Sequence, residues 1–172
     1  MTMAKLRGIK SIDRQFNRWL RKYGFKTRVR GADTDFFWYH DDTISYSFFS
    51  PVSAVENWNE LLAELGCQYD IDVFFSSFLH ELGHAHTYND FTVEELDEYA
   101  EMNRLIIYEP SSFAESLDYV YTHLPVEYEA TRWAVNYINQ YPERVGELVE
   151  KVSKAVRRFY KIHKVVNEEM FA

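Results

Sequence analysis

Cysteine, proline and glycine are scarce in this chain of 172 residues, with one, four and six copies respectively. The single cysteine, Cys67, excludes an intramolecular disulfide and any zinc module built from several cysteines. No apolar run approaches the ~18 residues that a membrane span needs, and residues 1–10 contain no apolar signal-peptide core. The sequence therefore predicts a cytoplasmic protein that does not enter a membrane.

Basic residues are almost missing from the middle of the chain. Residues 31–142 hold two bases against 21 acids, a local charge of −19, whereas residues 1–30 hold ten bases and one acid, a local charge of +9. A strongly negative segment attracts cationic ligands and repels phosphate backbones. This pattern argues against nucleic acid as a partner and favours basic residues in whatever the middle segment binds.

Apolar and aromatic side chains, in contrast, are abundant, at 47% and 17% of the chain. They suffice for one packed domain spanning residues 1–172. An apolar stripe with helical spacing predicts a helix over residues 4–22, ended by Gly24. Alternating and β-branched segments then predict three short strands, with a hairpin turn at Asp41-Asp42. These strands cover residues 27–30, 36–40 and 43–49.

The remainder of the chain reads as helices. Gly66 closes the first of them, Thr92 and Glu95 form a capping box for the third, and Pro125 suits the first turn of the fifth. The expected fold class is α+β, mainly α, with an N-terminal helix, a small three-stranded sheet, a motif helix and C-terminal helices. The expected helices span residues 53–65, 72–88, 92–108, 110–124, 126–140 and 142 onward.

The helix expected over residues 72–88 carries the motif His80-Glu81-Leu82-Gly83-His84. Two histidines four residues apart face the same way on a helix, so both can bind one zinc ion. Glu81 is turned away from that direction and can serve as general base. The alternative is a solvent-facing helical turn, but the apolar neighbours of the motif favour burial. Gly83 lowers helix stability by about 1 kcal/mol relative to alanine, so we expect close packing at this position.

The sequence resembles the gluzincin branch of the zincin metallopeptidases, in which a glutamate on a later helix is the third zinc ligand. The run Glu127-Tyr128-Glu129-Ala130, together with the histidine motif, is similar to the ImmA/IrrE-type peptidases and to small phage or bacterial metallopeptidases. The resemblance implies a zincin-like fold and a zinc ion bound by His80, His84 and Glu127. It also implies that Ala130 and Ala134 let the two helices approach closely.

One departure from the family pattern leaves the third ligand open. Glu127 follows His84 by 43 residues, a longer gap than the family leads us to expect. The competing candidates for this ligand are Glu129, His123, Glu115 and Asp118. SprT-like proteases would require a third histidine, which the sequence does not offer between His86 and His123.

The resemblance implies a peptidase mechanism. Zinc would lower the pKa of a water towards ~7, and Glu81 would take its proton and pass it to the leaving amine. An edge strand, which we expect at residues 43–49, would hold an extended peptide by backbone pairing. A second donor would steady the oxyanion, and Glu115 or Asp118 would orient the liganding histidines. The candidates for that donor are Tyr121, His123, Tyr128 and His86.

The sequence thus predicts a zinc-dependent metallopeptidase that cleaves a protein or peptide substrate. ImmA/IrrE-type peptidases are associated with cleavage of helix-turn-helix repressors in phages and mobile elements, which suggests a regulatory protein as the target. The alternative is a catalytically silent binding or regulatory protein that retains the zincin fold. A nucleic-acid-binding role for the basic N-terminal segment ranks below both.

Overall fold

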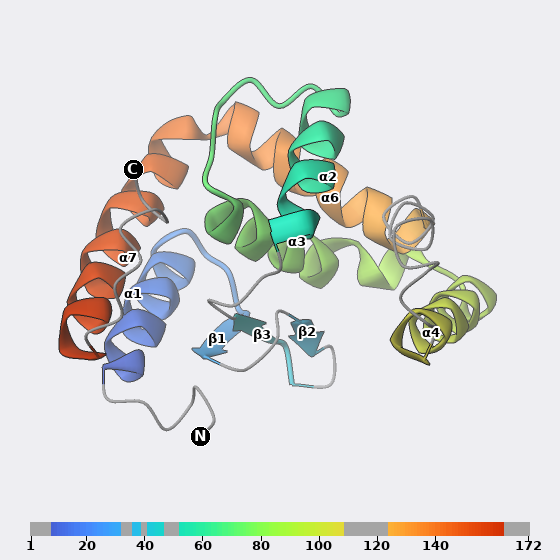
Figure 1. Cartoon of the computed structure of the whole chain (residues 1–172). Coiled ribbons are helices and arrows are strands. Elements are labelled where there is room, and N and C mark those ends of the chain that lie inside the picture. Colours follow the sequence, from blue (N-terminus) through green and yellow to red (C-terminus); the bar gives the residue numbers. More distant parts are fainter. Residues whose placement is uncertain (1–7, 32–35, 39–40, 47–51, 109–123, 164–172) are drawn as a thin grey trace.

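The computed structural model describes residues 8–31, 36–38, 41–46, 52–108 and 124–163. This part of the chain is mainly helical and contains one small sheet, which confirms the coarse prediction of an α+β, mainly α protein. In Figure 1, α3 and α6 cross at the centre, α1 and α7 lie side by side at one end, and α4 lies at the other.

Helix α1 (Ile9–Lys22) forms because its apolar residues fall on a single stripe, and that stripe is buried. The chain leaves the helix through Gly24, whose φ of 85° suits glycine. Near this end the Trp19 indole Nε1 donates a 2.8 Å hydrogen bond to the Arg144 carbonyl of α7 (Pro142–His163). The buried stripe consists of Ile9, Ile12, Phe16, Trp19 and Leu20.

The sheet has the strand order β1-β3-β2. Strand β3 (Thr43–Tyr46) pairs in parallel with β1 (Arg28–Gly31) and antiparallel with β2 (Phe36–Trp38). The antiparallel pair confirms the hairpin at Asp41-Asp42, where Asp42 takes a φ of 49°. The expectation that residues 43–49 form an edge strand was wrong. Strand β3 is central, because it pairs with β2 on one side and with β1 on the other.

Side chains of α1 close the outer edge of β1. The Asn17 amide donates to the Val29 carbonyl over 2.8 Å and accepts from the Val29 amide over 3.1 Å. Asp13 accepts a 2.9 Å hydrogen bond from the Gly31 amide. Edge groups that are satisfied in this way cannot pair with another strand. The strand at the opposite edge of the sheet is β2, which contacts α3.

The remaining helices begin and end close to the predicted positions. Gly66 (φ 79°) ends α2, Asp72 caps α3 through the Phe74 amide, and the Thr92–Glu95 capping box opens α4. The helix predicted over residues 110–124, and the strand ends at 39–40 and 47–49, lie outside the described residues. The helices are α2 (Val52–Glu64), α3 (Val73–Thr87), a short 3₁₀ helix (Tyr88–Asp90), α4 (Val93–Tyr108) and α6 (Pro125–Gln140).

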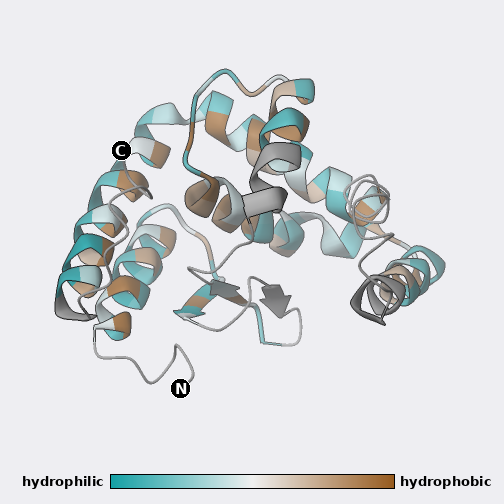
Figure 2. Cartoon of the chain, in the orientation of Figure 1, coloured by the Kyte–Doolittle hydropathy of each residue, from teal (hydrophilic) through white to brown (hydrophobic). Residues whose placement is uncertain are grey.

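One apolar core joins α1, the sheet, α3, α6 and α7. Figure 2 shows hydrophilic and hydrophobic segments alternating along α1 and α7, as expected of helices with one buried face. The core-facing side of α7 is buried at Val145, Val152, Val156 and Phe159. Within the described ranges, no helix is both long and apolar enough to cross a membrane.

Candidate metal centre

The candidate site depends on the close approach of α3 and α6. A Cβ atom added to Gly83 would lie 2.3 Å from the carbonyl oxygen of Ala130, far inside contact distance. Ala130 and Ala134 are fully buried on the facing side of α6. Glycine on one helix and alanines on the other therefore let the backbones meet, and this explains the unfavourable glycine in the motif.

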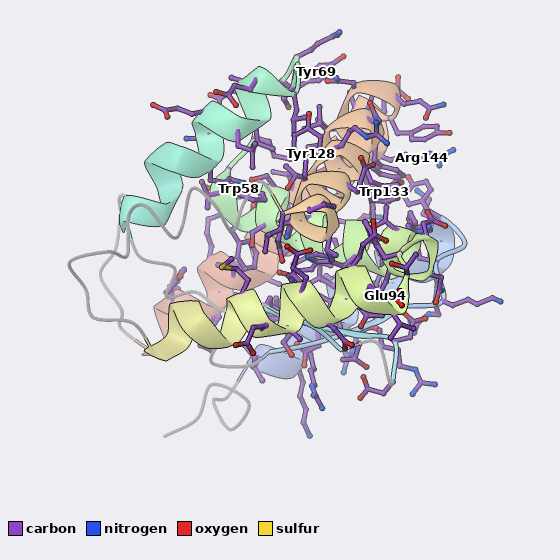
Figure 3. All side chains as sticks on the ribbon, turned by 90° about the vertical axis from the view of Figure 1, so that its right-hand side faces the viewer. Trp58, Tyr69, Glu94, Tyr128, Trp133 and Arg144 are labelled. Carbon is purple, nitrogen blue, oxygen red and sulfur yellow. The ribbon has the colours of Figure 1, made fainter. Side chains whose placement is uncertain are left out.

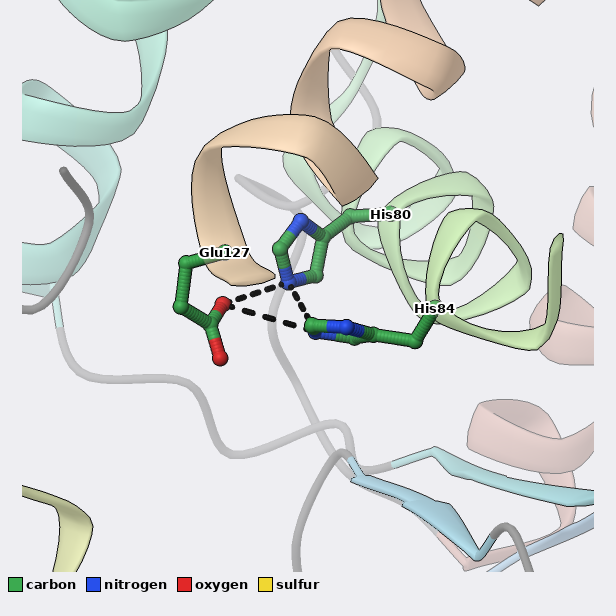
Figure 4. Close-up of side chains that lie close together, drawn as sticks. All are labelled: His80, His84 and Glu127. Atoms are coloured by element: carbon green, nitrogen blue, oxygen red, sulfur yellow. Dashed lines mark hydrogen bonds and ion pairs between the residues drawn. The ribbon is translucent and has the colours of Figure 1, made fainter. Parts of the chain in front are cut away.

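Three side chains converge at this crossing, as Figure 4 shows. His80 and His84 project from α3, and Glu127 projects from the first turn of α6. Each side chain is at most 7% exposed. One ligand atom from each lies within 4.8 Å of the others, so these residues form a group that could hold a metal ion.

The spacing of the ligand atoms fits a small tetrahedral metal ion. The Nε2 atoms of His80 and His84 lie 2.9 Å and 3.5 Å from Glu127 Oε2, and 3.1 Å from each other. Ligands held tetrahedrally at about 2.0–2.1 Å from zinc would lie roughly 3.3–3.4 Å apart. Glu127 Oε1 is buried and has no hydrogen-bond partner among the described residues. Both observations fit a cation at the centre of the group.

Thr131 orients the His80 ring through Nδ1, the ring nitrogen that does not face Glu127 and His84. Its hydroxyl donates a 2.9 Å hydrogen bond to the Glu127 carbonyl, one turn earlier on α6. The same oxygen lies 2.9 Å from His80 Nδ1, and because its proton is already used, it accepts from Nδ1–H. This places the proton on Nδ1 and leaves the Nε2 lone pair free to face the centre.

The charges of the three residues are coupled. Burial alone would raise the pKa of Glu127, but the two histidines outweigh it and hold that pKa well below its ordinary value. Burial, followed by the neighbouring His84, lowers the pKa of His80. For His84, burial is outweighed by Glu127, and its pKa is raised. The ionised carboxylate is stabilised by positive charge beside it, which either a protonated His84 or a bound metal ion can supply.

Two aromatic residues that the sequence did not single out form walls of the site. The Trp58 ring of α2 meets the His80 ring edge-on at 5.0 Å, and its Nε1 donates to Ser76 Oγ. The Tyr99 ring of α4 lies 6.4 Å from the His84 ring. Tyr99 is therefore an additional candidate for a polar group near a bound substrate. Neither residue has a motif that could have revealed it.

Of the four residues that compete with Glu127 as the third ligand, the described ranges include Glu129 alone. Glu129 forms an ion pair with Arg132 on the surface of α6 and does not join the cluster. Glu115, Asp118 and His123 lie outside the described residues. Glu127 is therefore the third candidate ligand that the described part of the chain provides.

The proposed oxyanion donors are less well placed. His86 is exposed near the end of α3, where its ring stacks on the Trp133 ring of α6 at 4.6 Å. Tyr128 is half-buried beside Glu127 on α6, and Figure 3 shows it together with Trp133. Tyr121 lies outside the described residues.

Glu81 is half-exposed, in contrast to the buried histidines on either side. Its carboxylate is close enough to His84 to help raise the pKa of that imidazole. The arrangement therefore holds a buried set of three ligands with an accessible carboxylate next to it.

Comparisons of this chain with protein families, curated proteins and solved structures find no match. We therefore infer the function chiefly from the geometry of these residues.

Proposed function

We propose that the chain is a zinc-dependent metallopeptidase of zincin-like fold, with His80, His84 and Glu127 as zinc ligands. The observation that carries the proposal is the buried convergence of these ligand atoms around the unpartnered Glu127 Oε1. Two neutral nitrogens and one carboxylate are a donor set that suits zinc and leaves a position open for catalysis. The resemblance to gluzincins, including ImmA/IrrE-type peptidases, supports the same set.

The roles of the chain's own residues follow from their placement. A bound zinc ion would supply Lewis-acid chemistry by acidifying a water and polarising a carbonyl. Glu81, half-exposed beside His84, accepts the proton of the attacking water and delivers it to the leaving amine. Thr131 holds the tautomer of His80 that presents Nε2. Trp58 and Tyr99 shield the ligands from bulk water, which strengthens electrostatic interactions in the site.

The proposed substrate is an extended segment of a protein, such as a regulatory protein. Strand β2 lies at the sheet edge and contacts α3, so it takes the substrate-pairing role first expected of residues 43–49. Helix α4, which brings Tyr99 to His84, exposes five acids over Glu94–Glu101. Such a surface favours basic residues in the substrate.

The test combines metal content with cleavage. We expect elemental analysis to find about one zinc per chain in the wild type and in Glu129→Ala, and none in Glu127→Ala. Glu81→Gln retains zinc and loses at least ~100-fold of the cleavage of a mixed peptide library, read by mass spectrometry. Zinc without cleavage above the Glu81→Gln background would instead favour a silent zincin-like binding protein. A wild type that takes up no zinc would refute both.

A further inference from the structure

A second site lies at the N-terminal end of α3, separate from the metal-binding residues. A cavity of about 370 Å³ opens between the connection from α2 to α3, the end of α6 and the first turns of α7. This volume falls in the range of small-ligand pockets. Asp72, on its wall, precedes His80 by eight residues, which is roughly 12 Å along the helix.

The floor of the cavity is apolar and its rim is acidic. Ile138 and Val145 are buried at the floor, with the partly buried Ile71 and Val149 beside them. The charged residues lining the cavity, Asp70, Asp72 and Glu150, are all acids. Tyr69 is 45% exposed at the rim, and Figure 3 shows it well away from Glu94 of α4.

Gly146, which lines the cavity, has no packing role. Glycine inside a helix is less stable than alanine. At Gly83 the neighbouring backbone excludes any side chain, whereas a Cβ at Gly146 would meet nothing within 4 Å. A single Cβ at position 146 would therefore leave the cavity open, whereas a larger side chain there would extend into it. Of these two helical glycines, Gly83 is required by helix packing and Gly146 is not.

The helix ends near the cavity do not favour an anion. The amides at the start of α3 are bound by Asp72, through its carboxylate for Phe74 and its carbonyl for Phe75 and Ser76. The Arg144 and Val145 amides of α7 bind the Tyr141 carbonyl. Glu150 forms an ion pair with Lys154 of α7, so Asp70 and Asp72 are the acids that set the charge a ligand meets.

We propose that this cavity binds an organic cation with an apolar body, either a free alkylamine or a lysine side chain of a polypeptide. The alkyl part lies on Ile138, Val145 and Val149, and the ammonium group faces Asp70 and Asp72. The exposed ring of Tyr69 adds a surface that attracts cations. This site and the metal centre have different ligands and can be tested separately.

The experiment is an NMR titration of the full chain with n-hexylammonium, and with hexan-1-ol and hexanoate as controls matched in length. We expect n-hexylammonium alone to shift the backbone amide signals of residues 69–72 and 145–150. Gly146→Leu fills the cavity and weakens binding at least tenfold, whereas Gly146→Ala changes it little. Asp70→Asn weakens binding roughly two- to fivefold, as expected for an exposed charge.

Several results would overturn the proposal. The first is that hexanoate or hexan-1-ol binds as tightly as n-hexylammonium. The second is that Gly146→Leu leaves the binding of n-hexylammonium unchanged. The third is that the amide signals of residues 69–72 and 145–150 do not shift. The peptide Ac-Leu-Lys-NH2 then distinguishes the two sources of the ammonium group. Tighter binding of this peptide than of n-hexylammonium identifies a polypeptide lysine, and weaker binding identifies a free amine. Unchanged zinc content in Gly146→Leu would show that the variant is folded and that the metal centre is independent.

Discussion

Replacing Gly83 with alanine tests whether the contact between α3 and α6 builds the metal centre. The new Cβ would lie 2.3 Å from the Ala130 carbonyl oxygen and 2.9 Å and 3.0 Å from its carbonyl carbon and Cα. All three are backbone atoms, so no side-chain rotation relieves the clash. Reaching ordinary contact at 3.4 Å requires the helices to separate by about 1.1 Å.

This separation has a thermodynamic and a functional consequence. Overpacking lowers the free energy of unfolding by about 1–3 kcal/mol, and the better helix propensity of alanine returns about 1 kcal/mol. We therefore expect a net loss of up to about 2 kcal/mol. Because His80 and His84 lie on one helix and Glu127 on the other, zinc affinity falls about tenfold or more.

Urea unfolding followed by circular dichroism, with a chelator-competition titration for zinc, measures both effects. Gly146→Ala is the matched control, because its Cβ has open space and the helix gains about 0.5–1 kcal/mol. The two substitutions are chemically identical, yet their predicted effects on stability have opposite signs. A Gly83→Ala variant as stable as the wild type, with unchanged zinc affinity, would refute the close contact and the argument built on it.

Two further predictions address hydrogen bonds that the structure reveals. Thr131→Val removes the acceptor for His80 Nδ1 and should weaken zinc binding by about ten- to hundredfold. Thr131→Ser retains the acceptor and should retain the zinc affinity. Equal zinc affinities of the two variants in a competition titration would contradict the assignment. Burial raises the pKa of Asp13 above 3.8, against the opposing hydrogen bonds from Tyr46 and Gly31. The folded state therefore holds this proton more tightly, and the contribution of Asp13 to stability, present below pH 3.8, is lost as pH rises through the raised pKa. Urea unfolding should show Asp13→Asn gaining stability relative to the wild type over that range, and a pH-independent difference would exclude the effect.

Features that depend on neighbouring residues in the chain were predictable from the sequence. The Thr92–Glu95 capping box forms as expected, and Gly24 and Gly66 take the positive φ angles that end α1 and α2. Pro125 occupies the first turn of α6. Each of these signals acts within four residues, so the sequence contains the whole interaction.

Features set by packing between distant segments were not predictable. The central position of β3 depends on β1 pairing beside it, and this pairing leaves the alternation within β3 unchanged. Thr131 gave no signal as a partner of His80, because 51 residues separate them. Gly83 did signal a close approach, and the resemblance already named Ala130 on the facing helix, but the contact of Gly83 with the Ala130 backbone follows only from the crossing of α3 and α6.

The 43-residue gap between His84 and Glu127 illustrates how packing overrides sequence spacing. The distances between the ligand atoms are fixed by the contact of Gly83 with Ala130, so the length of the intervening chain does not affect them. The described part of that chain forms α4, which brings Tyr99 beside His84 and exposes an acidic surface. The long gap is therefore compatible with an intact metal centre. Because α4 brings Tyr99 beside His84, we expect this helix to restrict access to the candidate ligands.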